Sequence, residues 1–382
     1  MSRSLIIIGA SARGAAFSAI RAGFEPYAID LFADSDLAAV CPTQKIRNYP
    51  ADFLPALNAA PSAPWIYTGG LENYPRLVDQ MAKVRPLWGN PGKVLRRVRN
   101  PFLLAERLRA AGVLVPELAR QLAQGGHKPG DWLQKPLRSS AGLRIRLLRS
   151  ELRRAKKRSC YYQRFVQGRP CGAVFNSQQG ECQLLGSTNQ LLLGDDFPAM
   201  PFGYHGSYGP RRMSSTERAQ LQLAGDTLVR EFGLRGLFNV DYILGKHNSV
   251  CVLEVNPRYS ASVEVLENSL GFQSMQLHSA EFSSSPQRDL RPNLSKLPQR
   301  YSGKTIVYAK SSVVVSRTLI SLVKAWNRHS LSPGLADISA VGDRIAAGSP
   351  IATVLCQSNR IGELKSELAK RSRQVEKAMS RV

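Results

Sequence analysis

Three side chains suited to binding a metal ion lie close together near the middle of the chain. Asp241 interrupts the apolar run FNVDYIL, and Glu254 and Asn256 lie in and directly after the run SVCVLEV. The intervening GKHN is typical of a turn, so the runs are predicted to pair as a hairpin. Alternation along a strand then points Glu254 and Asn256 to one face, where Asp241 can meet them. Such hard oxygen ligands suit a Mg²⁺ ion that also holds nucleotide phosphates, and the alternative is an edge hairpin with solvated acids.

A lysine followed by small residues is a second candidate site, about one hundred residues earlier. Lys135 lies in the strand-like stretch WLQKPL, which leads into Ser139, Ser140, Ala141 and Gly142. A lysine on a rigid strand beside a small-residue loop can place a positive charge and several backbone N–H groups around phosphates. The alternative is a surface lysine before an ordinary turn.

Together these motifs resemble those of the ATP-grasp ligases. The spacing D-x12-E-x-N-P-R is similar to the magnesium site of that family, and a K-P dipeptide with a Gly/Ser-rich loop precedes it in both. The resemblance implies that Mg²⁺ or Mn²⁺ is bound by Asp241, Glu254 and Asn256. It implies catalytic roles for Lys135 and Arg258, the latter near the phosphates or the acyl-phosphate. ATP is expected to contact Lys135, Ser139, Ser140, Gln163, Arg164, Phe165 and Val166, with Gln163 reading the adenine amino group.

The chain begins with the pattern of a βαβ unit. An apolar strand at Leu5–Ile8, a small-residue turn, an Ala-rich helix to Gly23 and a strand ending on Asp30 are expected. The fold class is therefore α/β, and the family resemblance, which covers nearly the whole chain, implies an α+β ATP-grasp architecture. It divides the chain into a Rossmann-like domain (1–96), a bipartite ATP-grasp domain (97–285, lid about 115–165), and a small β-rich domain with a terminal helix (286–382).

Two other functions stay open. Gly9-x-Ser11-x-x-Gly14 with Asp30 imitates a dinucleotide fingerprint, which makes an NAD(P)-binding oxidoreductase one alternative, although Ser11 replaces a glycine of that motif. The other is a basic nucleic-acid-binding protein, because the formal net charge is +24 and basic residues crowd the segment 138–158. Few aromatic residues accompany that charge, and no helix-turn-helix, KH or RRM signature is present, so nucleic acid is not the expected partner.

Composition limits the compartment and the class of protein. With 382 residues and 43% hydrophobic content, the chain can form two or three domains with their own cores. No apolar stretch reaches the roughly 18–20 residues of a membrane helix, and no signal peptide is read. The six cysteines form no CxxC pair, which argues against a zinc site and a disulfide framework. A cytoplasmic protein without a membrane partner is expected.

Three further segments carry specific expectations. The stretch 186–212 contains too many Gly, Pro and aromatic residues for regular elements, so it is predicted to be a substrate- and phosphate-facing loop. The candidate side chains of this loop are His205, Tyr208, Arg211 and Arg212. Helices are predicted over about 101–111 and 216–232.

The resemblance also implies a reaction. A member of this family joins a carboxylate to an amine through an acyl-phosphate and releases ADP and phosphate. Small, anionic carboxylate and amine substrates are expected from the basic charge, and a homodimer is left open. The segments GASARGAAFSAIRAG, WGN and LADISAVGDRIAAGSPIATVL are similar to a subgroup linked to tetrahydromethanopterin-dependent one-carbon metabolism.

Overall fold

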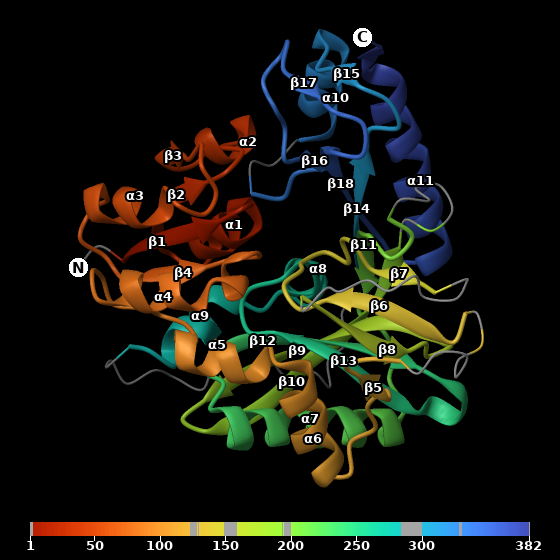
Figure 1. Cartoon of the computed structure of the whole chain (residues 1–382). Coiled ribbons are helices and arrows are strands. Elements are labelled where there is room, and N and C mark those ends of the chain that lie inside the picture. The colour runs from red at the N-terminus through yellow and green to blue at the C-terminus, as the bar shows by residue number, and fades with distance from the viewer. Residues whose placement is uncertain are drawn as a thin grey trace.

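The fold is taken from a computed structural model of the chain (Figure 1). It describes residues 3–122, 128, 130–148, 159–192, 194, 200–283, 300–327 and 331–381. Four sheets are present among these residues, and the largest has eight strands. Within the described part of the chain, no helix is long and apolar enough to cross a membrane.

The N-terminal part is a parallel four-stranded sheet flanked by helices. Its strand order is β3-β2-β1-β4. The strands are β1 (Ser4–Gly9), β2 (Glu25–Asp30), β3 (Thr43–Lys45) and β4 (Trp65–Tyr67). The helices are α1 (Arg13–Arg21), α2 (Ser35–Ala38), α3 (Phe53–Ala59), η1 (Leu71–Asn73), α4 (Pro75–Ala82) and α5 (Gly92–Val98). Helices cover both faces of β1, which explains why its apolar run does not alternate with polar residues. The predicted βαβ opening is confirmed.

The central sheet is antiparallel and has the order β13-β12-β9-β10-β11-β14-β18-β16. Its strands are β9 (Arg169–Gln178), β10 (Glu181–Leu192), β11 (Tyr204–Gly209), β12 (Gly236–Leu244), β13 (Val250–Asn256), β14 (Tyr301–Tyr308), β16 (Leu335–Ala336) and β18 (Pro350–Ser358). Strands β12 and β13 form the predicted hairpin, closed by the short turn η3 (Lys246–Asn248). The register sets Asp241 opposite Glu254.

Helices pack on this sheet and end where the sequence indicates. They are α6 (Pro101–Ala110), α7 (Ser215–Phe232), α8 (Ala261–Leu270) and α9 (Ser274–Ala280). The Ser214 hydroxyl caps α7 by accepting from the N–H of Glu217, and Gly233 ends the helix in the left-handed region. The helices predicted near 101–111 and 216–232 are confirmed.

The prediction of an irregular loop over 186–212 is wrong for much of its length. Strands β10 and β11 run through it, and their pairing places Asn189 opposite Tyr208. Gly186 has a φ of 146° and lies at a register shift between β10 and β9, so it serves a bulge and not a loop. Cross-strand pairing with distant partners overrode the local signal of Gly, Pro and aromatic residues.

A separate small sheet lies over the central one (Figure 1). It is antiparallel, with the order β5-β8-β6-β7. Its strands are β5 (Leu118–Ala119), β6 (Trp132–Pro136), β7 (Arg146–Leu147) and β8 (Cys160–Arg164). We call it the lid sheet. Most of the basic residues of the segment 138–158, namely Arg149, Arg153, Arg154, Lys156, Lys157 and Arg158, lie outside the described residues.

The C-terminal part extends the central sheet through β14, β18 and β16 and adds a small sheet. That sheet has the order β17-β15-β19, with β15 (Val313–Val314), β17 (Arg344–Ile345) and β19 (Ser380–Arg381). The helices of the C-terminal part are α10 (Arg317–Trp326) and α11 (Ile361–Ala378). The domain boundaries expected from the sequence stay a prediction.

A buried ionic cluster connects all three parts. Arg13 of α1 pairs with Glu264 of α8, and its Nε donates to Asp337 Oδ1 at 2.9 Å. Lys304 of β14 also pairs with Glu264, at 2.6 Å. These four side chains come from sequence positions up to 324 residues apart, so the cluster fixes how the parts pack together.

Candidate active site

One cavity of about 480 Å³ lies between the lid sheet, the central sheet and the turns that follow β1 and β4. It brings together most of the residues selected from the sequence. Those that line it are Lys135, Ser140, Gln163, Phe165, Val166, Asp241, Glu254, Asn256 and Arg258. Ser139 lines a smaller adjoining cavity, and Arg164 lines neither.

Asp241 is the centre of an amide network on the floor of the large cavity. Its Oδ1 accepts from Gln190 at 2.6 Å and from Asn239 at 2.8 Å, while Oδ2 accepts from Asn256 at 2.9 Å. Because each amide must turn its NH₂ group to the carboxylate, the carboxylate also fixes where the three amide oxygens point. The predicted clustering of Asp241, Glu254 and Asn256 is therefore seen in the structure.

The two acids of the hairpin differ in their electrostatic surroundings. Burial and the neighbouring Glu254 carboxylate raise the pKa of Asp241 to about 6. Burial also acts to raise the pKa of Glu254, but the cations Lys135, Arg99 and Arg258 together lower it below its ordinary value. Two carboxylates that repel each other at the edge of a cavity favour a bound cation.

The donor set fits a magnesium ion that shares its coordination with phosphates. Among the described residues, no group of three or more His, Cys, Asp and Glu side chains could hold a metal. Asp241 and Glu254 supply two carboxylates, and the side chain of Asn256 supplies an amide oxygen. Mg²⁺ commonly takes one or two carboxylates and completes its shell with phosphate oxygens and water, so this incomplete set suits it.

Lys135 approaches the cavity from the lid sheet. It is 5% exposed, and its Nζ donates to Gln163 Oε1 at 3.2 Å and lies 3.9 Å from Glu254 Oε2. Burial acts to lower the pKa of Lys135, but Tyr161 and Glu254 outweigh it and raise the pKa above the ordinary value. A buried, charged lysine at this position can contact an anion in the cavity.

The loop after Lys135 closes one side of the cavity. Gly142 has a φ of 71°, and a Cβ there would overlap the carbonyl oxygen of Phe202. The N–H of Tyr204 donates to the carbonyl of Ala141 at 3.0 Å, which docks the loop on the start of β11. Of the small residues predicted to shape a phosphate loop, Gly142 is thus required by the backbone path and by the space available.

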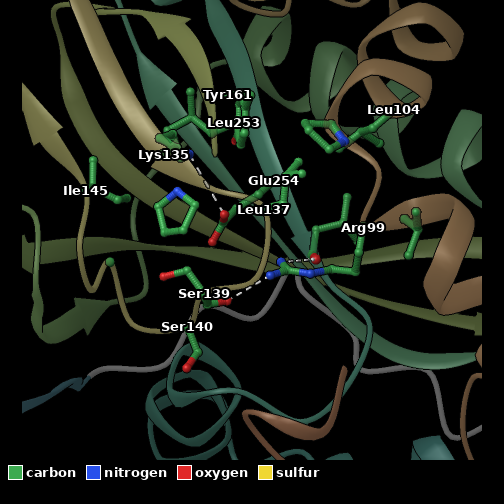
Figure 2. Close-up of a pocket in the computed structure, with 15 residues that line it drawn as sticks. Arg99, Leu104, Lys135, Leu137, Ser139, Ser140, Ile145, Tyr161, Leu253 and Glu254 are labelled. Atoms are coloured by element: carbon green, nitrogen blue, oxygen red, sulfur yellow. Dashed lines mark hydrogen bonds and ion pairs between the residues drawn. The ribbon is translucent and has the colours of Figure 1, made fainter. Parts of the chain in front are cut away.

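Arg99 is a cation that the sequence reasoning missed. It lies in the turn after α5 and lines the smaller cavity of about 40 Å³, together with Lys135 and Glu254 (Figure 2). Its Nη2 donates to the carbonyl of Ser139 at 2.9 Å, and its Nε has no partner among the described residues. The only sequence signal was a basic residue beside a helix boundary, in a chain that has many.

Arg258 enters the cavity from the turn after β13, and its guanidinium is hydrogen-bonded to Glu72 of the N-terminal part. Its Nε and Nη2 donate to Glu72 Oε1 at 3.1 and 2.8 Å, and Nη2 also donates to Asn256 Oδ1 at 3.3 Å. Burial acts to lower the pKa of Arg258, and the pairing with Glu72 more than compensates and raises it. Arg258 therefore bridges the N-terminal part and the floor of the cavity.

Apolar side chains also line the cavity. Phe165 and Val166 line it, and the ring of Phe165 lies 6.4 Å from that of Phe202. The Arg164 side chain turns away and pairs with Asp131 at 3.3 Å. An apolar slot beside the end of a strand can accept a flat heterocycle.

Four residues predicted to face the substrate do not line the cavity. Arg211 pairs with Glu217, Tyr208 packs in the C-terminal core, and the ring of His205 lies edge-to-face with that of Tyr308 at 6.5 Å. Arg212 also lies outside the lining. The segment instead contributes Gln190, Leu192, Phe202 and Tyr204, which alternation along β10 and β11 could have indicated only if those strands had been recognised.

Asp30, the acid of the dinucleotide-like pattern, already has hydrogen-bond partners within the N-terminal part. Asp30 is 1% exposed and accepts from the N–H groups of Ala12, Phe32 and Ala33 at 2.6–2.7 Å. Burial raises its pKa, against the effect of these bonds. Because this carboxylate is buried and already accepts from three backbone donors, it is not placed to bind a ribose hydroxyl.

Comparison with known proteins supports the fold. Residues 98–262 match the ATP-grasp domain family. The carboxyaminoimidazole ribonucleotide synthase of Aspergillus clavatus superposes with a TM-score of 0.72 at 13% identity, over 98% of this chain and 99% of that one. The L-amino acid ligase of Bacillus licheniformis superposes with a TM-score of 0.71 at 16% identity, over 99% and 98%.

A third structure is similar over the same length. The biotin carboxylase domain of the Hydrogenobacter thermophilus 2-oxoglutarate carboxylase, solved with MgADP and bicarbonate, gives a TM-score of 0.72 at 14% identity, over 100% of this chain and 90% of that one. No curated protein matches the sequence. Residues 98–262 thus match the ATP-grasp domain, and the chain as a whole has the mixed α/β fold of these solved structures.

Proposed function

We propose that the protein is an Mg²⁺-dependent, ADP-forming ligase that joins a carboxylate to an amine. The observation that carries this proposal is the cavity itself, which is lined by the charged side chains of Lys135, Asp241, Glu254 and Arg258 and by apolar side chains that include Phe165 and Val166. The apolar lining suits adenine, and the charged side chains suit phosphates with their metal. The ATP-grasp domain match over 98–262 supports ATP as the nucleotide.

Each residue has a place in this proposal. Asp241, Glu254 and Asn256 hold the metal, and Lys135 and Arg99 face the phosphates. Ser139, Ser140 and the rest of their loop cover the phosphates with backbone N–H groups. Gln163 and the backbone of Arg164 and Val166 recognise adenine. The metal, Mg²⁺ or Mn²⁺, neutralises phosphate charge when bound.

The chemistry needs positioning more than acid–base groups. A substrate carboxylate oxygen attacks the γ-phosphorus, the bond to the β-phosphate oxygen breaks, and ADP leaves. The amine nitrogen then attacks the acyl carbon of the acyl-phosphate, releasing phosphate and a proton. Arg258 and Lys135 stabilise the charge that develops on the transferred phosphoryl group, which is the main contribution that such sites make.

The finer expectations rest on the sequence. Small anionic substrates, a homodimer, a cytoplasmic location and membership of the subgroup linked to tetrahydromethanopterin-dependent one-carbon metabolism stay predictions. The net charge of +24 supports an anionic substrate by long-range attraction.

The proposal is tested with the purified chain, MgATP and pools of carboxylates and amines, with ADP release as the readout. Glu254→Gln is expected to lower turnover by about two orders of magnitude or more, the scale of a lost transition-state contact. Glu106→Gln, on the exposed face of α6, is the matched control. Equal turnover of the two variants at saturating Mg²⁺ contradicts a catalytic metal at the hairpin.

Nucleotide binding is tested separately, because it needs no substrate. Excess MgATP is expected to raise the thermal midpoint, since a hundredfold excess over Kd stabilises the folded state by about 2.7 kcal/mol. Lys135→Ala should reduce that rise, whereas Lys370→Ala, at an exposed position of α11, should not. A rise with NADP⁺ and none with MgATP rules the ligase out.

A further inference from the structure

The short turn η1 (Leu71–Asn73) of the N-terminal part contacts residues that line both cavities. Glu72 accepts two hydrogen bonds from Arg258, and Asn73 donates its Nδ2 to the carbonyl of Ser139 at 3.3 Å. Arg99 Nη2 donates to Asn73 Oδ1 at 3.4 Å. Two adjacent residues thus contact two cations, Arg99 and Arg258, and the loop 139–142 that follows Lys135, which we call the phosphate loop.

Glu72 is an unusual residue to bury. It is 1% exposed, and only one of its oxygens is paired, because Oε2 has no hydrogen-bond partner among the described residues. Two tyrosines of the same part, Tyr49 and Tyr67, lie close enough for the carboxylate to raise their pKa further than burial alone. A buried carboxylate with only one hydrogen-bonded oxygen is not expected to add to the stability of the fold. We therefore expect Glu72 to have another role.

The charges around Arg258 indicate what Glu72 does. On its cavity side, Arg258 is attracted by Asp241 and Glu254, and it already donates to Asn256. These are the three proposed metal ligands. Without Glu72, the acids that still attract the Arg258 guanidinium are Asp241 and Glu254. A guanidinium that moved toward them would occupy the proposed metal site with a fixed positive charge.

We propose that Glu72 and Asn73 are positioning residues of the active site. Glu72 holds Arg258 away from the carboxylates of the hairpin so that they remain free for Mg²⁺. Asn73, with Arg99, holds the Ser139 carbonyl and thereby the closed form of the phosphate loop. The inference rests on the proposed function, and it makes a complete nucleotide site depend on the docked N-terminal part.

The test uses the full chain with AMP-PNP, a non-hydrolysable ATP analogue, at a series of MgCl₂ concentrations, followed by isothermal titration calorimetry. Glu72→Gln is expected to raise the Mg²⁺ concentration needed for half-maximal AMP-PNP affinity by roughly tenfold, which corresponds to about 1.4 kcal/mol of competition by Arg258. Glu72→Asp, which keeps the charge, should restore part of the Mg²⁺ affinity.

A matched control separates positioning from stability. Glu217→Gln removes an equally buried carboxylate from an arginine, Arg211, that does not line the cavity. Both variants should lose thermal stability, but only Glu72→Gln should change the Mg²⁺ requirement. An unchanged Mg²⁺ requirement in Glu72→Gln, with AMP-PNP still bound by the parent protein, overturns the inference and leaves the proposed function intact.

The second residue has its own signature. Asn73→Ala should weaken AMP-PNP binding at saturating Mg²⁺ by roughly fivefold to tenfold, since it removes a hydrogen bond worth about 1 kcal/mol and frees the loop. Asn73→Asp keeps the acceptor for Arg99 but loses the donor to Ser139. Its AMP-PNP affinity should therefore lie between that of the parent and that of Asn73→Ala. Affinity equal to the parent in Asn73→Ala refutes its part of the proposal. Failure of the parent to bind AMP-PNP would instead refute the nucleotide site itself.

Discussion

His278 is predicted to make the stability of the protein depend on pH. It lies on α9, where its Nδ1 accepts from the N–H of Leu237 at 2.9 Å and its Nε2 faces the carbonyl of Trp88 at 3.0 Å. A backbone N–H can only donate and a carbonyl can only accept, so the ring is neutral with its proton on Nε2. A second proton on Nδ1 would face the N–H of Leu237.

The magnitude follows from the pKa. Burial lowers the pKa of His278 from 6.5 to about 4, against smaller raising effects of Trp88 and Glu281. Between these values the unfolded chain binds a proton that the folded chain does not, so stability is complete above about pH 6.5 and is lost as pH falls toward 4. The difference of about 2.5 in pKa, at about 1.36 kcal/mol each, gives a maximum near 3.4 kcal/mol, of which about 2 kcal/mol is lost at pH 5.

The assay is urea unfolding at a series of pH values, for the parent and for His278→Asn, whose amide oxygen can still accept from Leu237. The variant is expected to be less stable at pH 8 but to lose about 2 kcal/mol less than the parent between pH 8 and pH 5. Other acids titrate in this range, so the difference between the two proteins is the informative quantity. Parallel loss of stability in both proteins refutes the assignment of a neutral, buried imidazole.

Two further predictions concern the phosphate loop and the ionic cluster. Gly142→Ala should weaken MgATP binding by roughly tenfold, because a left-handed alanine costs about 1–2 kcal/mol and its Cβ meets Phe202; Gly112→Ala, also left-handed but with open space around it, should not, and equal affinities would contradict the argument. Glu264→Gln should lower the free energy of unfolding in urea by about 3 kcal/mol or more, because Arg13 and Lys304 lose their buried partner. A loss no larger than that of Glu367→Gln, a half-exposed pair with Arg371, would show that Glu264 is dispensable.

The part of the site that lies on the β12–β13 hairpin was predictable, since the information is local. Two apolar runs and a turn predict the hairpin and bring Asp241 close to Glu254, although the exact pairing of these two residues follows a register shift between Asp241 and Tyr242 that the pattern does not predict. Lys135 was predictable for the same reason, because a strand followed by small residues limits where its side chain can reach. The helices α6 and α7 carry their own end signals, such as the Ser214 cap and Gly233.

The rest of the site depends on contacts that no local pattern encodes. Glu72 and Arg258 are 186 residues apart in the chain, and neither position is distinctive among many charged residues. Gln190 and Asn239 reach the cavity because β10 and β12 both flank β9, a sheet order that the loop-like composition of 186–212 concealed. Residues that approach a site from separate elements become visible only when the packing of those elements is known.

Two of the buried ionic groups, Glu72 with Arg258 and Glu264 with Arg13, join parts of the chain that are distant in sequence. Removing a charged group from water carries a penalty of several kcal/mol, which a single pair seldom recovers, so apolar residues of similar volume would hold the parts together at least as well. Apolar contacts, however, are not directional, whereas a guanidinium fixes its carboxylate partners in distance and in plane. In this molecule that directionality matters most at Arg258, which lies between Glu72 and Asn256. A displacement of the N-terminal part would therefore move the guanidinium relative to the hairpin, and the proposed catalytic geometry exists only when the N-terminal part is docked.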